Sequence, residues 1–400
     1  MTSLRALLPV YLKIGLLSFG GPAGQIALMQ QEIVAQRQLM EDATFQRGLN
    51  VAMLLPGPEA QQLATWLGWR LHGLAGGLAA GLAFILPGTA LMIALAALAA
   101  TRGDEGIVAA IFYGIQPAVL VIVGRAVIAL GQRALNGVRP LLIALLAFIA
   151  LTVLGLPFPL VVAGAALAGF MLPSVPAPDL PPQPMRWGGT LKIIAGFTVL
   201  VLAVFLVVRW LFGPEPFDEV AELFLSAAFV SFGGAYALLP YVADRAVETY
   251  GWLSPEQMLN GLAIAEATPG PLILVNVYAG YFAGAGGGAS VATALLACFY
   301  TFAPSFMLIL AAAPHVEAMQ RQRWIRQALA GVSAAVVGVV LNLALYLGVA
   351  ALLPGGEIAW LKVGLLGLFA IWSWWRAPGV LPLIVTGMGT GIGLWGLGLI

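Results

Sequence analysis

Two short motifs occur twice in this chain, and both contain residues that interrupt helices. The first copy reads Ser18-Phe19-Gly20-Gly21 and then Pro56-Gly57-Pro58. The second reads Ser231-Phe232-Gly233-Gly234 and then Pro269-Gly270-Pro271, with both motifs displaced by 213 residues. Proline lacks an amide hydrogen and clashes with the preceding helical turn, and glycine loosens a helix. The motifs therefore predict broken helices at matching positions of two repeated halves.

A helix that restarts after a break has free N–H groups and a partial positive charge, and both attract anions. In an apolar layer these N–H groups must face protein, water or a ligand. Four such helix starts would form an oxyanion site if they meet. We therefore expect the substrate-binding residues to be the motif residues and their polar neighbours: Ser18, Gly20, Gly21, Pro56, Gly57, Pro58, Glu59, Gln62, Ser231, Gly233, Gly234, Pro269, Gly270, Pro271 and Asn276.

The alternative interpretation of these glycines and prolines is close helix packing, because small residues are common where membrane helices approach each other. It suits isolated glycines such as Gly15, Gly24 and Gly68. A doubled pair of motifs at fixed spacing favours a binding site, since irregular backbone at membrane depth is tolerated chiefly where it lines a cavity.

Charged residues in or beside the predicted spans are candidates for attracting the anion or for coupling its transport to protons: Lys13, Arg37, Glu59, Arg125 and Glu266. Glu59 follows Pro58 directly, so it caps the new helix, carries a proton, or does both. A lone Lys13 inside the first span favours an ion pair or an anion-attracting role, because a charge there is costly. Arg125 either neutralises a buried acid or extends to the membrane interface.

The segment from Gln30 to Arg47 is amphipathic and contains Arg37. We expect it to form a solvated interfacial helix in which Glu32, Glu41 and Asp42 face water, while Arg37 could recruit an anion at the mouth of a pathway.

The composition is that of a membrane protein. Of the 400 residues 61% are hydrophobic and 9% are charged, whereas a soluble domain has about 25% charged residues. A single Cys298 excludes an internal disulfide and a thiolate metal cluster, and two histidines are too few for a metal site. The chain has no catalytic cluster, no nucleotide-binding loop and a net charge of +1. We expect no enzyme, no cofactor, no metal and no nucleic-acid partner.

Apolar runs long enough to cross a bilayer predict an all-α integral membrane protein of about 13 transmembrane helices, arranged as two inverted structural repeats with broken helices. Residues 1–172 form the first repeat, residues 173–217 a proline-rich linker with one connecting helix, and residues 218–400 the second repeat. The first two spans, Leu4–Gln30 and Thr44–Trp69, contain the breaks. A re-entrant hairpin at Pro56 is the alternative and would change the topology.

Lys and Arg cluster in cytoplasmic loops. With the Arg321–Arg326 loop inside, the N-terminus is cytoplasmic, the C-terminus lies outside, and the loop with Glu357 and Lys362 lies outside. Arg37 and Arg47 are the exceptions, because this topology places them on the outer side.

Three stretches resemble the chromate ion transporter family. They read S-F-G-G-P-A-G-Q from Ser18 to Gln25, M-L-L-P-G-P-E-A-Q-Q-L-A-T-W-L-G-W from Met53 to Trp69, and A-E-A-T-P-G-P-L-I-L-V-N from Ala265 to Asn276. The likeness covers both halves, so the chain resembles the long, two-domain type. It implies a carrier of the bacterial cytoplasmic membrane that expels chromate, with sulfate as a structural mimic.

Other functions fit the same scaffold. A carrier for sulfate or another anion that works in the uptake direction has the same requirements, and so has an anion channel. An inside-negative potential is worth about 2.3 kcal/mol per charge per 100 mV, so it can drive efflux of a dianion without proton coupling. The expected partners are the transported anion and the lipid bilayer, and a homodimer is compatible with the sequence.

Overall fold

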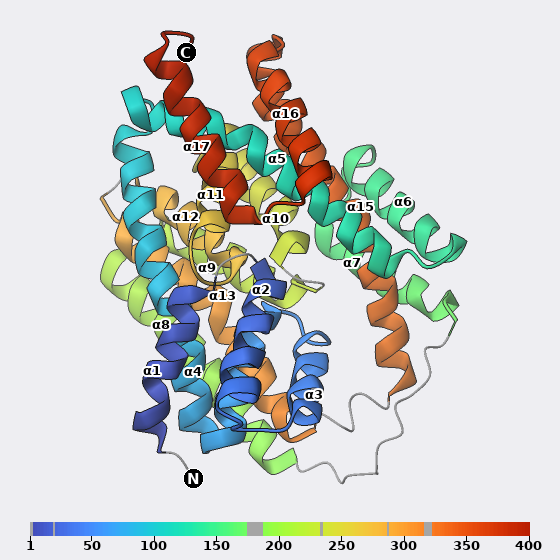
Figure 1. Ribbon diagram of the computed structural model, residues 1–400. Coiled ribbons are helices and arrows are strands. Elements are labelled where there is room, and N and C mark those ends of the chain that lie inside the picture. Colours follow the sequence, from blue (N-terminus) through green and yellow to red (C-terminus); the bar gives the residue numbers. More distant parts are fainter. Residues whose placement is uncertain (1–2, 19–20, 174–186, 233–234, 286–287, 316–321) are drawn as a thin grey trace.

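The computed structural model describes residues 3–18, 21–173, 187–232, 235–285, 288–315 and 322–400, and these residues contain helices, turns and loops but no strand. Five helices are long and apolar enough to cross a membrane (Figure 1): α4 (Glu59–Arg102), α5 (Gly106–Ala134), α8 (Trp187–Phe212), α13 (Ser290–Ala312), which the 3-10 turn η6 extends to His315, and α15 (Arg323–Leu352). The chain is an all-α, multi-pass membrane protein, as predicted.

Each half begins with the same series of short helices. The first half has α1 (Leu4–Leu17), α2 (Gly21–Met29), the π-helix η1 (Gln30–Gln36) and α3 (Asp42–Ala52) before α4. The second half has α9 (Phe217–Val230), α10 (Ala235–Ala243), the π-helix η3 (Asp244–Thr249) and α11 (Pro255–Ala267), followed by the 3-10 turn η4 (Leu272–Leu274) and α12 (Val275–Ala283). The described residues around the doubled motifs therefore form the same order of elements in both halves, except that the 3-10 turn η4 follows the second break.

The remaining helices complete the two halves. In the first half α5 is followed by α6 (Val138–Thr152), α7 (Phe158–Ala168) and the 3-10 turn η2 (Gly169–Met171). In the second half α15 is followed by the 3-10 turn η7 (Pro354–Gly356), α16 (Trp360–Arg376) and α17 (Val380–Gly396).

The expected first span is a helical hairpin. Lys13 on α1 and Glu32 on η1 form an ion pair with 2.6 Å between nitrogen and oxygen, although they are 19 residues apart. Nineteen residues of continuous helix would separate them by about 28 Å. The chain therefore reverses near Ser18, and Leu4–Gln30 does not cross as one interrupted span.

The expected second span also folds back. A Cβ on Gly48 of α3 would overlap the ring of Trp66, which lies beyond the Pro56 break. The first arm of α4 ends at His72-Gly73, where Gly73 has a φ of 63° and the helix is interrupted. A Cβ on Gly68 would meet the carbonyl oxygen of Gly76, so the two arms of α4 run antiparallel. The segment Thr44–Trp69 is thus the re-entrant alternative, and only the second arm of α4 is long enough to cross.

Equivalent helices of the two halves pack antiparallel. In the second arm of α4, Gly77 faces Leu310 of α13, because a Cβ added to Gly77 would lie 2.9 Å from the leucine Cδ2. Gly81 faces Phe306 in the same way. Further along α4, the hydroxyl of Thr89 lies 3.4 Å from the sulfur of Cys298. Antiparallel crossing of equivalent helices is what a twofold axis in the membrane plane produces. Inversion of the halves across a membrane stays a prediction, which this packing favours.

The two halves also exchange their last helices. A Cβ on Gly114 of α5 would meet the carbonyl oxygen of Gly387 on α17, and a Cβ on Gly331 of α15 would meet that of Ala165 on α7. The last helix of each half therefore packs in backbone contact against the other half. Such close approach requires small residues at both crossings.

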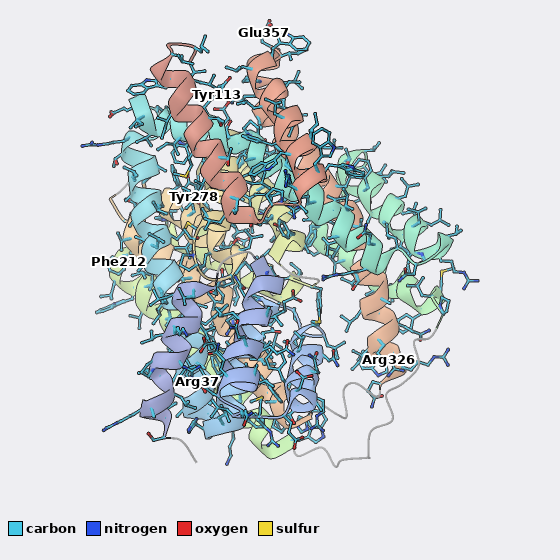
Figure 2. The ribbon with its side chains drawn as sticks, viewed as in Figure 1. Arg37, Tyr113, Phe212, Tyr278, Arg326 and Glu357 are labelled. Carbon is cyan, nitrogen blue, oxygen red and sulfur yellow. The ribbon has the colours of Figure 1, made fainter. Side chains whose placement is uncertain are left out.

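The connecting helix α8 lies at the edge of the molecule, with Phe212 at its end (Figure 2). None of its most apolar stretch is buried. Thr190 anchors its first turn, because the hydroxyl donates to the carbonyl of Ala311 at 3.2 Å and lies 2.7 Å from His315 Nε2. Ile193, Phe197 and Val201 continue this contact with the core along one face. We infer that lipid covers the other faces of α8.

The hairpins change the expected side of Arg37. Figure 2 shows Arg37 and Arg326 toward one end of the molecule and Glu357 at the other. The sequence topology placed Arg37 opposite Arg326, because it treated Leu4–Gln30 as a crossing span. With a hairpin in its place, Arg37 returns to the end from which the chain started.

Ion pairs hold the first hairpin of each half together. In the first half Lys13 and Arg37 both donate to Glu32, which is 2% exposed. In the second half Arg245 donates to Glu222 at 3.0 Å. Arg245 stands 213 residues after Glu32, so the same position of the repeat holds an acidic residue in the first half and a basic residue in the second. The prediction that Glu32 faces water is wrong, because the carboxylate turns inward to reach both cations.

We call the cluster of Lys13, Glu32 and Arg37 the Glu32 clasp, and replacing Glu32 tests it. Glu32 lies in η1, outside the five candidate spans, and its hydrogen bonds with Lys13 and then with Arg37 hold the pKa of its carboxyl below the ordinary value. We expect Glu32→Gln to lower the free energy of unfolding by about 2 kcal/mol, because two charge-assisted hydrogen bonds are lost. Thermal melting of the solubilised protein measures this, and Glu41→Gln at an exposed position is the control.

The same clasp predicts a pH dependence. A lowered carboxyl pKa stabilises the fold above the ordinary Glu pKa of about 4.3, and this stabilisation disappears as the pH falls through the lowered value. The melting difference between the native chain and Glu32→Gln should therefore be full at neutral pH and shrink in acid. A difference that is constant through the acid range contradicts the role of Glu32.

Candidate functional site

The tips of the four hairpins meet, and each break contacts the opposite half. The amide of Gly57 donates to the carbonyl of Ser231 at 2.7 Å, and the amide of Gly270 donates to the carbonyl of Ser18 at 3.1 Å. Ser18 is 1% exposed and Ser231 is fully buried, and both glycines are buried. We call the contact of Ser231 with Gly57 the Ser231 junction and that of Ser18 with Gly270 the Ser18 junction.

Local sequence explains both junctions. Gly57 and Gly270 have φ values of 128° and 104°, a region that side chains other than glycine rarely adopt. The prolines on either side remove two amide donors that the interior would have to satisfy. Ser18 and Ser231 end α1 and α9 with nearly the same backbone angles, φ −81° and ψ 69° against φ −78° and ψ 66°.

Four helices start at these tips. Helix α4 begins at Glu59 directly after the first break, and η4 begins at Leu272 directly after the second. Helices α2 and α10 begin at Gly21 and Ala235, just after the two serines. The motifs thus bring the helix starts together in pairs, two at each junction. A single oxyanion site shared by all four starts stays a prediction. The expected site residues Gly20, Gly233 and Gly234 lie outside the described residues.

The two junctions are not equally braced. At the Ser18 junction, the hydroxyl of Ser18 accepts a second contact from the amide of Gly270 at 3.1 Å and donates to Gly15. The side-chain amide of Gln25 donates to the carbonyls of Gly270 at 2.6 Å and Ser18 at 3.3 Å. Leu238 stands at the position of Gln25 in the second half, and the Ser231 hydroxyl has no hydrogen-bond partner. The Ser231 junction therefore keeps one free hydroxyl donor.

A second hydroxyl adjoins the Ser231 junction. A Cβ on Gly57 would lie 2.7 Å from the hydroxyl oxygen of Ser305 on α13 and 2.5 Å from the amide nitrogen of Gln62. Ser305 donates to Gln61 at 2.6 Å, and Gln62 donates to the carbonyl of Pro56 at 2.7 Å. The polar side chains of the junction thus hold the first break in place.

The opposite junction lacks this hydroxyl. Pro87 and Pro304 occupy equivalent positions, so Gly88 corresponds to Ser305, and a Cβ on Gly88 would meet the carbonyl oxygen of Pro269. The Ser18 junction thus has Gly88 at the position where the Ser231 junction has Ser305. Asn276, an expected site residue, lies on α12 beyond the second break and donates to Thr301 at 3.1 Å.

Sequence reasoning missed Gln25, Ser305 and Thr301 as partners of the breaks, whereas Gln61 is one of the neutral donors expected beside the first break. Gln25 lies inside a quoted motif stretch, and Ser305 follows one of the repeat-matched prolines. A comparison of equivalent positions for polar residues present in one half alone would have found Gln25 and Ser305.

The charged residues that the sequence suggested for anion attraction or proton coupling lie at different positions in the fold, each with its own partner. Glu59 is half-buried at the start of α4, where Arg133 of α5 attracts it. Glu266 is buried on α11 and accepts a hydrogen bond from the hydroxyl of Tyr236. Arg125 donates to the carbonyl of Pro378 at 2.7 Å, so it joins α5 to the loop before α17.

Lys13 and Arg37 lie in the clasp around Glu32, away from the junctions, and the three groups together carry a net positive charge. An anion-attracting role for these residues at the mouth of a pathway stays a prediction.

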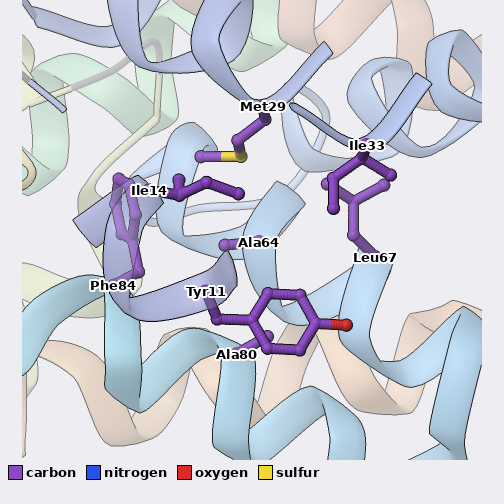
Figure 3. Close-up of a pocket in the computed structure, with 8 residues that line it drawn as sticks. All are labelled: Tyr11, Ile14, Met29, Ile33, Ala64, Leu67, Ala80 and Phe84. Atoms are coloured by element: carbon purple, nitrogen blue, oxygen red, sulfur yellow. The ribbon is translucent and has the colours of Figure 1, made fainter. Parts of the chain in front are cut away.

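Two cavities are unsuited to an anion. A void of about 10 Å³ lies among apolar side chains of α1, α2, η1 and α4, and Tyr11 brings the polar atom that Figure 3 shows beside it. Its size is that of one water molecule. A cleft of about 630 Å³ includes Asp244 and Glu248, whose charges repel anions.

Comparison with known proteins places the chain. The chromate transporter family model matches residues 5–170 and 219–394. The chain belongs to the chromate transporter family. No group of three His, Cys, Asp or Glu side chains that could hold a metal occurs among the described residues of this family member.

Named members of the chromate transporter family match over most of their length. A probable chromate transport protein of Synechococcus elongatus is 29% identical over 98% of this chain and 96% of that protein. Chromate transport proteins of Pseudomonas aeruginosa and Cupriavidus metallidurans are 33% and 28% identical, over 82% and 84% of this chain and 77% and 81% of those proteins. No solved structure matches the chain.

The two serines should differ in what they contribute to stability. We expect Ser18→Ala to lower the free energy of unfolding by about 1–2 kcal/mol, because its hydroxyl makes two buried hydrogen bonds. Ser231→Ala should change stability little or raise it, since it removes a buried hydroxyl without a partner. Thermal melting of the two variants side by side checks this. Equal losses would contradict the difference between the junctions.

Proposed function

We propose that this protein is a secondary transporter of a tetrahedral oxyanion and that the anion binds at the Ser231 junction. The observation that carries the proposal is the meeting of both broken segments with the opposite half, which brings two helix starts to each of two buried serines. Helix starts and backbone amides bind oxyanions without a basic side chain. Neutral donors hold a dianion without cancelling its charge, so it can also leave.

The proposed anion-binding site at the Ser231 junction, which we call the seat, uses groups of both halves. The amide of Gly57 leaves the carbonyl of Ser231 and donates to the anion, and the free hydroxyl of Ser231 is a further donor. The hydroxyl of Ser305 becomes a third donor when it leaves the side-chain oxygen of Gln61. Glu59 stands beside the seat, and an ionised carboxylate there would repel the anion. We propose that Glu59 is protonated while the anion is bound, and that Glu266 with Tyr236 forms a second proton-carrying pair.

Chromate is the proposed substrate, because the named relatives are chromate transport proteins. Sulfate has the same tetrahedral shape and charge and is the proposed competitor. For a dianion, an inside-negative potential favours efflux by about 4.6 kcal/mol per 100 mV, twice the value for one charge. We place the protein in the bacterial cytoplasmic membrane, with the N-terminus in the cytoplasm and the C-terminus outside.

A carrier fits the junctions better than a channel. Each junction is closed by a backbone hydrogen bond between the halves, and an anion can enter the proposed seat when that bond opens. A carrier opens its site to one side at a time, which inverted repeats provide by exchanging two equivalent conformations. Sulfate uptake on the same scaffold is the alternative that the flux experiment separates.

Chromate uptake into everted membrane vesicles tests the function. We expect energised accumulation of labelled chromate that excess sulfate inhibits and an uncoupler abolishes, because inside-out vesicles accumulate what the cell expels. Vesicles without the protein are the control. Sulfate accumulation in right-side-out vesicles, with no chromate movement in either orientation, would instead establish an uptake carrier.

The seat is tested by Ser231→Ala and Ser305→Ala. Loss of one hydrogen bond to a charged ligand lowers apparent affinity by about tenfold, so we expect the half-saturating chromate concentration to rise by that factor in each variant. Ser333→Ala, at an exposed position on α15, is the matched control. Unchanged affinity in both variants, at normal protein level, would move the seat away from the Ser231 junction.

A further inference from the structure

Lys362 on α16 is a buried lysine that the transport proposal does not use. It is 6% exposed, although the sequence topology placed it in an outer loop. Its ammonium donates to the side-chain oxygen of Gln116 on α5 at 2.7 Å and lies 4.7 Å from the ring centre of Tyr113. Gln116 in turn donates to Asn260 on α11 at 2.9 Å. Three helices from both halves thus surround one ammonium with neutral groups.

The charge of Lys362 is not neutralised by an ion pair. No carboxylate of the described residues forms an ion pair with Lys362, and Glu32, Asp218 and Glu222 pair with other cations. Glu256, one turn before Asn260, attracts the ammonium only through space. A buried charge among apolar helices is costly and normally has a partner of opposite sign. An anion is the kind of partner that would neutralise this charge.

The position of Lys362 connects it to both the surface and the centre. Tyr113, whose ring faces the ammonium, also lines a cavity of about 310 Å³ together with Trp395 and Ile400. Figure 2 shows Tyr113 toward the end of the molecule at which Glu357 lies. In the other direction, Asn260 lies seven residues before the end of α11 at Ala267, a rise of about 10 Å toward the breaks.

We propose that Lys362 is a second binding station for the transported oxyanion, between the cavity beside Tyr113 and the central junctions. This inference rests on the proposed function. The anion replaces Gln116 as the partner of the ammonium, and the ring of Tyr113 stabilises the ammonium when the station is empty. Gln116 and Asn260 position Lys362.

The competing explanation is structural. The chain from Lys362 through Gln116 to Asn260 also ties α16, α5 and α11 together, and its loss would then reduce stability without affecting anions. Gln116→Glu separates the two explanations. A carboxylate at this position would pair with Lys362 inside the protein, and the side-chain amide of Asn260 can turn over and donate to it. The tie is then preserved, while the charge that an anion needs is neutralised.

Binding and flux are measured on the full-length protein. Binding of sulfate and chromate to the solubilised protein is followed by thermal shift, and chromate flux is followed in proteoliposomes. We expect Lys362→Met and Gln116→Glu each to raise the half-saturating anion concentration by about tenfold, the effect of losing one charge-assisted contact. Lys362→Arg should restore most of the affinity. Lys192→Met, at an exposed position on α8, is the matched control.

The outcomes separate the two proposals. Flux by the native protein with the same half-saturating concentration in Gln116→Glu and Lys362→Met keeps the transporter and rejects the station. Binding that depends on Lys362 without any flux keeps the station and rejects the transporter. Absence of chromate and sulfate binding to the native protein rejects both. Poor folding of Lys362→Met leaves Gln116→Glu, which retains the tie, as the deciding variant.

Discussion

Backbone groups at a helix break have no water to bond with in an apolar interior, so they must find partners within the protein. This chain satisfies them across its two halves. The amides of Gly57 and Gly270 donate to carbonyls at the ends of α9 and α1, which are themselves unpaired because those helices stop there. Each half therefore completes the hydrogen bonds of the other, and neither half has a satisfied centre alone.

At the periphery of the molecule, too, helices of one half pack on helices of the other. Helix α17 of the second half packs on α5 of the first, and α7 of the first packs on α15 of the second, each through glycines that allow backbone contact. The halves are joined at the centre by hydrogen bonds and at the periphery by close packing. A movement that opens one junction must therefore be accommodated by sliding at these glycine crossings, where few side chains interlock.

The sequence predicted the helical membrane class, the family and the repeated breaks, because composition and doubled motifs are local properties. It did not decide for the hairpins, because the hairpin at Pro56 was only the alternative and the one at Ser18 was not expected. A segment such as Leu4–Gln30 is equally apolar whether it crosses or returns, and the pairing of Lys13 with Glu32 decides between them. The burial of Lys362 was missed for a similar reason, since a lysine near a helix start reads as a loop residue until Gln116 and Tyr113 are seen around it.

Departures from the repeat are more informative about function than the repeat itself. Two identical halves would give identical junctions, and a single anion would then have two equivalent seats. Here Gln25 and Gly88 close one junction tightly, whereas Leu238 and Ser305 at the equivalent positions leave the other with a free hydroxyl. This difference is the reason for proposing the Ser231 junction as the part that opens. The buried Lys362 on α16 likewise belongs to one half, so charge and hydrogen-bond donors are both distributed unequally over the two halves.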